Sequence, residues 1–246
     1  MNNKCSPGRT KNKNSCFSKI ELIQINNMIP NLQKNILDEQ LIEILKNKCK
    51  NSNTKTCNII KENINYILKP KIKKYGIWLN TNDINLIMNG YTKYDNSFGY
   101  LGTFPSDFCS FINLKKELKT YKQYSKLGLV LNLDNSTGPG FHWVSVFIDI
   151  NTKTIEYFNS LGKKPKETKK CIKKLIEELN AIYSLGGNFK FKYNTFVHQK
   201  GDSECGVYSV YFLIARILGY TFDEITTNIK DDKFMGKFRK FIFSSS

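Results

Sequence analysis

A mainly apolar segment at residues 207–216 follows directly after the dipeptide Cys205-Gly206. Its length and composition predict a buried helix, which places Cys205 at the helix N-terminus. The unpaired N–H groups and the positive dipole end of such a helix stabilise a thiolate, the form in which cysteine reacts. Cys205 is therefore a candidate nucleophile. The alternative is a small core cysteine, because free cysteines are among the most buried residues.

Gln199 precedes Cys205 by six residues, and its side-chain amide is a hydrogen-bond donor. The Gln199 amide and the backbone N–H of Cys205 are suited to hold the oxyanion of an acyl-transfer intermediate. Glycine at position 206 allows another chain to approach the sulfur closely. This segment predicts acyl-transfer chemistry at the start of the helix.

A cysteine nucleophile needs a base, and the chain has only two histidines, His142 and His198. His142 opens residues 142–150, whose β-branched and aromatic side chains predict a strand. Residues 151–153 are polar and turn the chain into a second strand at 154–158. His198 is interpreted as structural or incidental.

The second strand ends at Asn159. In an antiparallel hairpin, the start of the first strand lies beside the end of the second, so His142 and Asn159 are expected to meet. The Asn159 carbonyl is expected to accept the Nδ1–H of the imidazole and to leave Nε2 facing the thiol, as in a Cys-His-Asn arrangement. The alternative for Asn159 is a turn residue that caps the loop.

These residues and their order resemble the Ulp1-type, SUMO-protease-like superfamily of cysteine proteases. Residues 78–85 resemble the Trp-Leu-Asn-Asp…Ile-Asn element near the start of that catalytic domain. Within the superfamily, four segments resemble the polyprotein-processing proteases of African swine fever virus and other large DNA viruses. These segments are residues 132–143, 155–160, 198–206 and 231–239. Several motifs in the same order make a chance resemblance improbable.

The resemblance implies an α+β fold with a papain-like, Ulp1-like core, in which a mixed central sheet is flanked by helices. It implies a viral cysteine endopeptidase that cleaves structural polyproteins after Gly-Gly during virion maturation. The implied catalytic residues are His142, Asn159, Gln199 and Cys205. Most of the superfamily has Asp in place of Asn159, whereas the viral branch also has Asn.

The resemblance also implies substrate-binding roles for Trp78, Trp143 and Asn132. A core position is the ordinary expectation for tryptophan. In the superfamily, however, the two tryptophan positions form aromatic walls around the C-terminal residues of the substrate, and such a slot admits glycine only. The implied partners are viral polyproteins with Gly-Gly-X sites.

Two other functions remain open. The first is an isopeptidase that removes SUMO or other ubiquitin-like modifiers from host proteins, since these modifiers also end in Gly-Gly. The second is an inactive interaction scaffold, which is disfavoured because no catalytic position is missing. Contacts to a folded modifier would distinguish the isopeptidase from the endopeptidase.

The seven cysteines are odd in number and scattered, with no Cys-x-x-Cys pair. Neither a disulfide framework nor a zinc site is expected, and no metal or cofactor is implied. A reducing compartment suits a thiol enzyme.

No apolar stretch approaches the length of a membrane span and the polar start is no signal peptide, so we expect a soluble intracellular protein without membrane insertion. The expected locations are the host cytoplasm, at the virus factory, and the virion.

Residues 1–70 differ in character from the rest of the chain and predict a small helical arm. Residues 1–15 are basic and expected to be mobile. Ser18 and Glu21 resemble a capping box, and apolar residues predict helices near 20–25, 41–45 and 59–68. Pro70 and the basic run Lys69, Lys71, Lys73 and Lys74 mark a boundary before a catalytic domain at residues 71–246.

The remaining patterns predict helices at 83–91, 167–182, 205–218 and 231–241, and strands at 127–133 and 190–196.

The formal net charge is +17, from 38 lysines and arginines against 21 aspartates and glutamates. Such an excess favours an acidic substrate or nonspecific contact with nucleic acid. The densest basic patch comprises Lys163, Lys164, Lys166, Lys169, Lys170, Lys173 and Lys174. The alternative for this patch is a lysine-rich face that is only solvated. A protein that only binds nucleic acid is disfavoured, because that function would leave the spacing of the four candidate catalytic residues unexplained.

Overall fold

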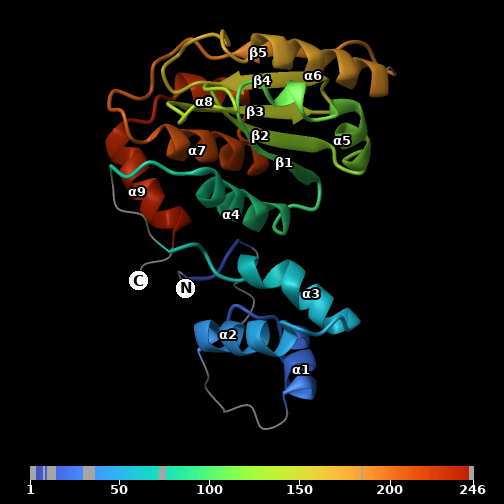
Figure 1. Ribbon diagram of the computed structural model, residues 1–246. Helices are drawn as coiled ribbons and strands as arrows, with labels where there is room; N and C mark the ends of the chain where they lie inside the picture. The colour runs from blue at the N-terminus through green and yellow to red at the C-terminus, as the bar shows by residue number, and fades with distance from the viewer. Residues whose placement is uncertain are drawn as a thin grey trace.

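The computed structural model describes residues 4–7, 9, 15–29, 37–71, 76–183 and 185–243. Most of the basic start, together with Lys73 and Lys74, lies outside these residues. Figure 1 shows α1, α2 and α3 grouped on one side of the larger unit that holds the sheet.

Three helices are present in the described part of residues 1–70, as the sequence predicts. They are α1 (Lys19–Met28), α2 (Asp38–Cys49) and α3 (Lys55–Asn63), and the 3-10 turn η1 (Ile64–Tyr66) follows. Ser18 and Glu21 form the predicted capping box at the start of α1. The arm has a hydrophobic cluster of its own: Cys5, Cys16, Phe17, Ile25, Leu41, Ile42, Leu45, Ile64 and Ile67.

Three disulfides contradict the expectation that the cysteines form no framework. The pairs are Cys5–Cys16, Cys49–Cys57 and Cys109–Cys171. Their spacing in the sequence carries no pairing signal, because the partners are brought together by helix packing and by the fold of the arm. Cys205 is the one free cysteine of the seven.

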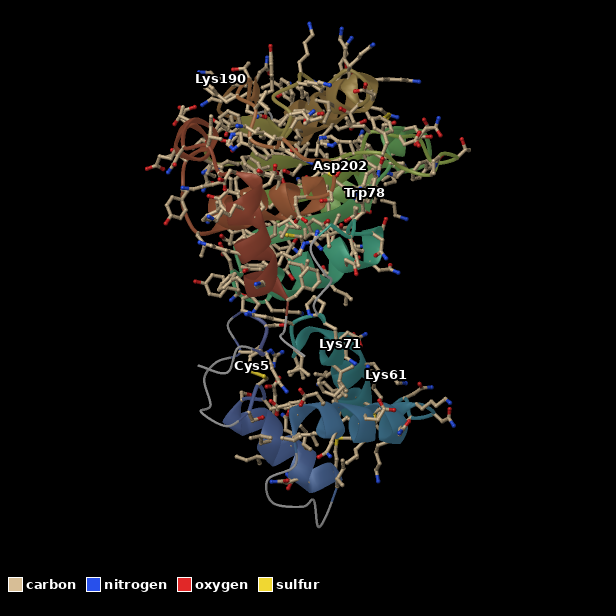
Figure 2. The ribbon with its side chains drawn as sticks, turned by 90° about the vertical axis from the view of Figure 1, so that its left-hand side faces the viewer. Cys5, Lys61, Lys71, Trp78, Lys190 and Asp202 are labelled. Atoms are coloured by element: carbon tan, nitrogen blue, oxygen red, sulfur yellow. A yellow bond between two sulfur atoms is a disulfide. The ribbon has the colours of Figure 1, made fainter. Side chains whose placement is uncertain are left out.

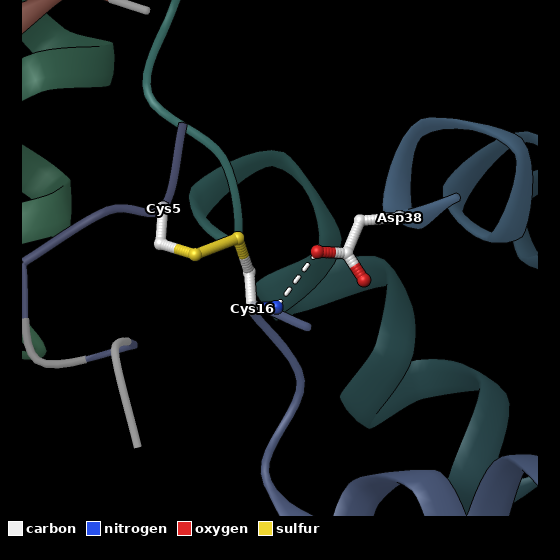
Figure 3. Close-up of side chains that lie close together, drawn as sticks. All are labelled: Cys5, Cys16 and Asp38. Atoms are coloured by element: carbon white, nitrogen blue, oxygen red, sulfur yellow. Dashed lines mark hydrogen bonds between the residues drawn. A yellow bond between two sulfur atoms is a disulfide. The ribbon is translucent and has the colours of Figure 1, made fainter. Parts of the chain in front are cut away.

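One disulfide lies beside a buried carboxylate. Figure 3 shows Asp38, at the start of α2, next to the Cys5–Cys16 bond, where the backbone N–H of Cys16 donates to Asp38 at 2.7 Å. The potential ligand atoms of these three residues lie within 4.8 Å of one another. Both sulfurs are already bonded to each other, so neither is the thiolate that a metal ion would require.

The catalytic-domain segment contains a mixed five-stranded sheet, which confirms the expected α+β class. Its strands are β1 (Phe98–Phe104), β2 (Lys126–Asn132), β3 (Trp143–Asp149), β4 (Thr154–Phe158) and β5 (Lys190–Tyr193), in the spatial order of their numbers. The β3–β4 hairpin is antiparallel, as predicted, with Ser145 opposite Phe158. The β1–β2 and β4–β5 pairs are parallel.

Helices cover both faces of this sheet (Figure 1). On one face lie α4 (Thr81–Thr92), α7 (Cys205–Ile217), α8 (Phe222–Thr227) and α9 (Asp232–Ile242). On the other lie η2 (Phe108–Ser110), α5 (Leu114–Thr120) and α6 (Lys169–Ile182). Side chains of β3 alternate between the two cores: Phe147 faces α7, whereas Val146 and Ile148 face α6.

The predicted helices at α4, α6, α7 and α9 and the predicted strands at β2 to β5 are confirmed within a few residues. The sequence patterns missed β1, α5 and α8. Within the part of the chain that the structure describes, no helix has both the length and the apolar character needed to cross a membrane.

Candidate active site

Helix α7 begins at Cys205, as its sequence predicts, and the side chain is 1% exposed. The backbone of Trp143, the residue that follows His142, lies near enough to the sulfur to lower the pKa of the thiol. The candidate nucleophile therefore lies near the first residue of β3, which directly follows the candidate base in the sequence. This arrangement joins two segments that are more than sixty residues apart in the sequence.

Gly206 is tightly packed against the protein's own chain. A Cβ atom at this position would lie 3.0 Å from Cβ of Leu79 and 3.3 Å from Cδ1 of Trp143. Leu79 and Trp143 of the protein itself therefore approach the start of α7 closely. Glycine allows these residues to pack tightly against the helix that carries Cys205.

His142 and Asn159 meet at the end of the β3–β4 hairpin, where the sequence places them. A distance of 2.9 Å separates Nε2 of His142 from Oδ1 of Asn159. Since a carbonyl oxygen only accepts, Nε2–H is the donor. The predicted use of Nδ1 for this bond is therefore wrong, and Nδ1 is the ring nitrogen that remains for the thiol.

Buried neighbours hold Asn159 in place. Its backbone N–H donates to Oδ1 of Asn194 at 2.8 Å, and Nδ2 of Asn194 donates back to the Asn159 carbonyl at 2.8 Å. The backbone N–H of Leu161 donates to Oδ1 of Asn159 at 2.9 Å. Sequence reasoning missed Asn194, because nothing local indicates that the loop after β5 returns to the hairpin.

Gln199 is buried and its amide has a defined orientation. The hydroxyl of Ser160 donates to Oε1 at 2.7 Å, and Nε2 donates to the carbonyl of Gly201 at 2.7 Å. An amide nitrogen carries two N–H donors, so one remains beyond the bond to Gly201. Ser160, which follows Asn159 directly, thus links the His142–Asn159 pair to the glutamine.

Two pockets meet at Trp78, which is 43% exposed. One is lined by His142, Asn159 and Gln199 and has a volume of about 730 Å³. Figure 2 shows Trp78 and Asp202, both of which line it, close together at the surface. The other pocket is lined by Trp78, Trp143 and Asn132.

The second pocket holds the three predicted substrate-binding residues in different environments. Trp143 is 7% exposed, and its Nε1–H donates to the Leu79 carbonyl at 2.8 Å. Oδ1 of Asn132 accepts the backbone N–H groups of Asp134 and Phe141 at 2.9 and 3.2 Å. Asn132 therefore also holds the loop between β2 and β3. Trp78 is the tryptophan that presents much of its ring to solvent.

Burial favours the neutral forms of both candidate catalytic groups. It raises the pKa of the Cys205 thiol, although hydrogen bonds with the backbone of Trp143, Gly206 and Cys205 itself act in the opposite direction. It lowers the pKa of His142; the bond to Asn159 opposes this shift, and the positive charge of Lys163 adds to it. The backbone groups at the helix start act in the expected direction, but desolvation outweighs them, so the net shift of the thiol pKa is upward and not downward as expected.

A buried ion pair lies next to the candidate nucleophile. Glu204, the residue before Cys205, receives hydrogen bonds from Nε and Nη2 of Arg239 in α9, both at 3.0 Å. Both side chains are 1% exposed. Nη2 of Arg239 also donates to the carbonyl of Ile77 at 2.9 Å. Arg239 therefore connects the start of α7 to the segment that carries Trp78, a role with no local signal in the sequence.

His198 has the structural environment that was expected for it. Its Nε2 lies 3.1 Å from the carbonyl of Thr226, and its ring packs edge-on against Phe158 and Tyr208. Burial lowers its pKa. These contacts leave His142 as the histidine that lines the pocket together with Asn159 and Gln199.

Two viral proteins resemble this chain in sequence. A protein of Acanthamoeba polyphaga mimivirus, named as a thiol protease, is 35% identical over 158 residues, which cover 61% of this chain and 51% of the relative. A cysteine protease of African swine fever virus is 36% identical over 120 residues, or 47% of this chain and 43% of the relative. The chain spans about half the length of the curated relatives it matches.

Solved structures and a family comparison agree with this likeness. The crystal structure of the African swine fever virus protease has a TM-score of 0.65 at 19% identity and covers 99% of this chain and 96% of that one. The yeast Ulp1 protease domain, in complex with the SUMO orthologue Smt3, has a TM-score of 0.51 at 16% identity over 87% and 95% of the two chains. At these identities the likeness concerns the fold. Residues 106–245 match the C-terminal catalytic domain of the Ulp1 protease family, and since this match covers more than half of the chain, the protein belongs to that family.

Proposed function

We propose that this protein is a viral cysteine endopeptidase that cleaves structural polyproteins after Gly-Gly during virion maturation. The observation that carries the proposal is the hydrogen bond between His142 and Asn159, together with the position of Trp143, which follows His142 and whose backbone lies near the Cys205 sulfur. A thiol, an imidazole and an orienting carbonyl in this order are the parts of a thiol-protease site. Family membership supports the same reaction class.

The reaction would proceed through a thioester. Sγ of Cys205 attacks the scissile carbonyl carbon and passes its proton to Nδ1 of His142. The backbone N–H of Cys205 and the remaining N–H of Gln199 stabilise the oxyanion. The C–N bond then breaks, and His142 protonates the leaving amine. A water molecule, deprotonated by His142, hydrolyses the thioester and restores the thiol.

The resting protonation states agree with this sequence of steps. Burial holds Cys205 as the thiol and His142 as the neutral imidazole, so the base is free to take the proton. Asn159 orients the ring without a negative charge. Proton transfer is therefore expected to accompany attack on the substrate, rather than to precede binding.

The Gly-Gly specificity rests on the two tryptophans and the tight packing around them. Trp78 and Trp143 line one pocket next to the pocket that holds His142, and Asn132 in β2 is paired directly with Trp143 in β3. Glycine residues would pass between large rings where a Cβ atom would collide with them. Substrate binding by Trp78, Trp143 and Asn132 is part of this proposal.

One experiment tests the proposed function directly. The protein is incubated with Gly-Gly-X peptides from viral core polyproteins, with matched Ala-Ala-X peptides, and with a ubiquitin-like fusion. We expect cleavage after Gly-Gly and none after Ala-Ala, as detected by mass spectrometry. Equal cleavage of both peptide sets would contradict the specificity, and no cleavage of any substrate would contradict the proposed activity.

The second candidate function is removal of ubiquitin-like modifiers from host conjugates. Two observations favour it: some African swine fever virus relatives are named as SUMO-1 cysteine proteases, and the Ulp1 domain of similar fold binds Smt3. Rapid cleavage of the folded fusion, together with slow cleavage of the peptides, would support this function over polyprotein processing. Action in the host cytoplasm and the virion, and nonspecific contact of the basic surface with nucleic acid, stay predictions.

Gln199→Ala is expected to slow catalysis without removing the reactive thiol. Loss of one oxyanion donor costs about 2.7–4 kcal/mol in the barrier, seen mainly in kcat. Alkylation of Cys205 by iodoacetamide should continue at a similar rate, because the substitution leaves the thiol and His142 in place. Ser160→Ala provides a milder comparison, since it removes only the bond that orients the amide. Loss of alkylation in the Gln199 variant would instead assign this residue to thiol activation or folding.

Asn159→Ala is expected to cost less activity than His142→Ala, because water or a backbone carbonyl can replace a neutral orienting group. Asn159→Asp is expected to be tolerated, since a carboxylate accepts the same Nε2–H bond. The carboxylate should also raise the pKa of His142, which shifts the acidic limb of the pH–rate profile to higher pH. An unchanged acidic limb in the Asp variant would contradict the Nε2–Oδ1 contact as the orienting bond.

A further inference from the structure

The pocket that contains His142 and Asn159 has a basic rim. Lys163, Lys164 and Lys166 line it together with the candidate catalytic residues. All three lysines belong to the loop between β4 and α6, which starts at Asn159 itself. The densest basic segment of the chain therefore begins at the candidate catalytic centre.

The turn before these lysines is held by backbone contacts. The N–H of Gly162 donates to the Asn159 carbonyl at 2.8 Å, and Gly162 has a φ of +65°. A Cβ atom at this position would lie 2.6 Å from the carbonyl oxygen of Thr195. Only glycine fits this conformation and this contact, so the turn directs Lys163 towards the pocket from a defined position.

The rim lysines are available to a ligand. All three are exposed, and among the described residues none of them has a carboxylate within 4.0 Å. The acidic residues that line the same pocket, Glu167 and Asp202, are also without such a partner. Lys163 is near enough to His142 for its charge to act on the imidazole.

The position of the rim indicates which part of a substrate it would meet. The two tryptophans line the neighbouring pocket, which holds none of the candidate catalytic side chains. The acyl part of the substrate, which ends in Gly-Gly, would pass there. The leaving amine must be reached by His142, which protonates it. The residues after the scissile bond would therefore enter the pocket that Lys163, Lys164 and Lys166 line.

We propose that Lys163, Lys164 and Lys166 form a subsite that selects acidic side chains at the first two positions after the scissile bond. This inference rests on the proposed endopeptidase function and names the substrate class of that site. Two or three ammonium groups within several ångströms of a carboxylate at a solvent-exposed site would favour an acidic over a basic peptide by about tenfold.

The test compares kcat/KM for three Gly-Gly peptides that differ only in the two residues after the scissile bond: Glu-Glu, Gln-Gln or Lys-Lys. The intact protein should cleave the Glu-Glu peptide about tenfold faster than the Lys-Lys peptide. Salt of about 1 M, where the screening length is about 3 Å, should remove most of the difference. The Gln-Gln peptide should be intermediate.

A pair of matched variants distinguishes the rim from the general positive charge. Lys163→Glu with Lys164→Glu should reverse the preference, whereas Lys169→Glu with Lys170→Glu should leave it unchanged. Both variants change the net charge equally, but Lys169 and Lys170 lie in α6 and do not line the pocket. Each preference is the ratio of kcat/KM values for two peptides cleaved by the same variant. Any effect of Lys163 on the pKa of His142 changes both values alike and cancels in this ratio.

The outcomes separate the inference from the proposed function. Equal cleavage of the three peptides by the intact protein, or the same shift in both variants, would overturn the acidic subsite while leaving the endopeptidase proposal standing. Failure to cleave any of the Gly-Gly peptides would overturn the endopeptidase proposal and the subsite with it.

Discussion

Cys205→Ala is expected to abolish peptide cleavage while the protein remains folded. The substitution removes the attacking sulfur, and no other free cysteine is available, because the remaining six are paired in disulfides. A small side chain at the first position of α7 disturbs the packing little. Activity should fall to the background of the peptide assay, and circular dichroism and the unfolding midpoint should stay close to those of the parent protein.

His142→Ala should lose nearly as much activity as Cys205→Ala. The thiol and its base act as one unit, so removing either residue removes most of the catalysis that both provide. His198→Ala is the matched control: it removes the other buried histidine, which contacts Thr226 instead of Asn159. It should lower stability and leave kcat in the folded fraction largely unchanged. Residual turnover in the Cys205 variant near that of the parent would exclude a thiol mechanism.

Alkylation provides an independent readout of the same residue. Without reductant, iodoacetamide should label Cys205 alone, and labelling should accelerate as the pH rises towards the raised pKa of the thiol. The reason is that the thiolate reacts, and burial reduces its population near neutral pH. Labelling of Cys109 or Cys171 in the native protein would contradict their disulfide.

Arg239→Met is expected to destabilise the protein by about 3–5 kcal/mol, because it leaves the Glu204 carboxylate buried without its partner. The measured quantity is the free energy of unfolding in urea. Adding Glu204→Gln should recover much of the loss, since the double variant buries no uncompensated charge. The two substitutions should therefore be strongly non-additive.

The same variant tests whether Arg239 positions the nucleophile. An unpaired Glu204 carboxylate next to Cys205 raises the pKa of the thiol, so the alkylation profile of Arg239→Met should shift to higher pH. Arg216→Met is the matched control. It breaks a second, partly buried ion pair, between Arg216 near the end of α7 and Glu156 in β4, where Nε and Oε2 are 2.7 Å apart.

Arg216→Met should also lower stability, but it should leave the alkylation profile in place, because its partner is remote from the start of α7. Equal shifts in both variants would mean that Arg239 acts only through overall stability. Unchanged stability of Arg239→Met would contradict the buried ion pair itself.

Local patterns in the sequence were sufficient for the main parts of the candidate site. The apolar run after Cys205 predicts α7 and its first residue, since the length and composition of the run are local properties of the sequence. Two segments of β-branched and aromatic residues around a polar turn predict the β3–β4 hairpin, and the geometry of a hairpin is enough to bring His142 to Asn159. The capping box of α1 is equally local.

Only the tertiary structure decided which atoms meet. The ring nitrogen that binds Asn159 depends on how β3 enters the sheet, and the bonds from Asn194 and Ser160 depend on a loop that returns after β5. The pairing of six cysteines and the Arg239–Glu204 contact likewise join residues whose spacing carries no periodicity. A sequence shows each residue's neighbours along the chain, whereas these contacts arise from packing between distant segments. The same packing buries the Cys205 thiol, and this burial raises its pKa more than the backbone groups at the helix start lower it.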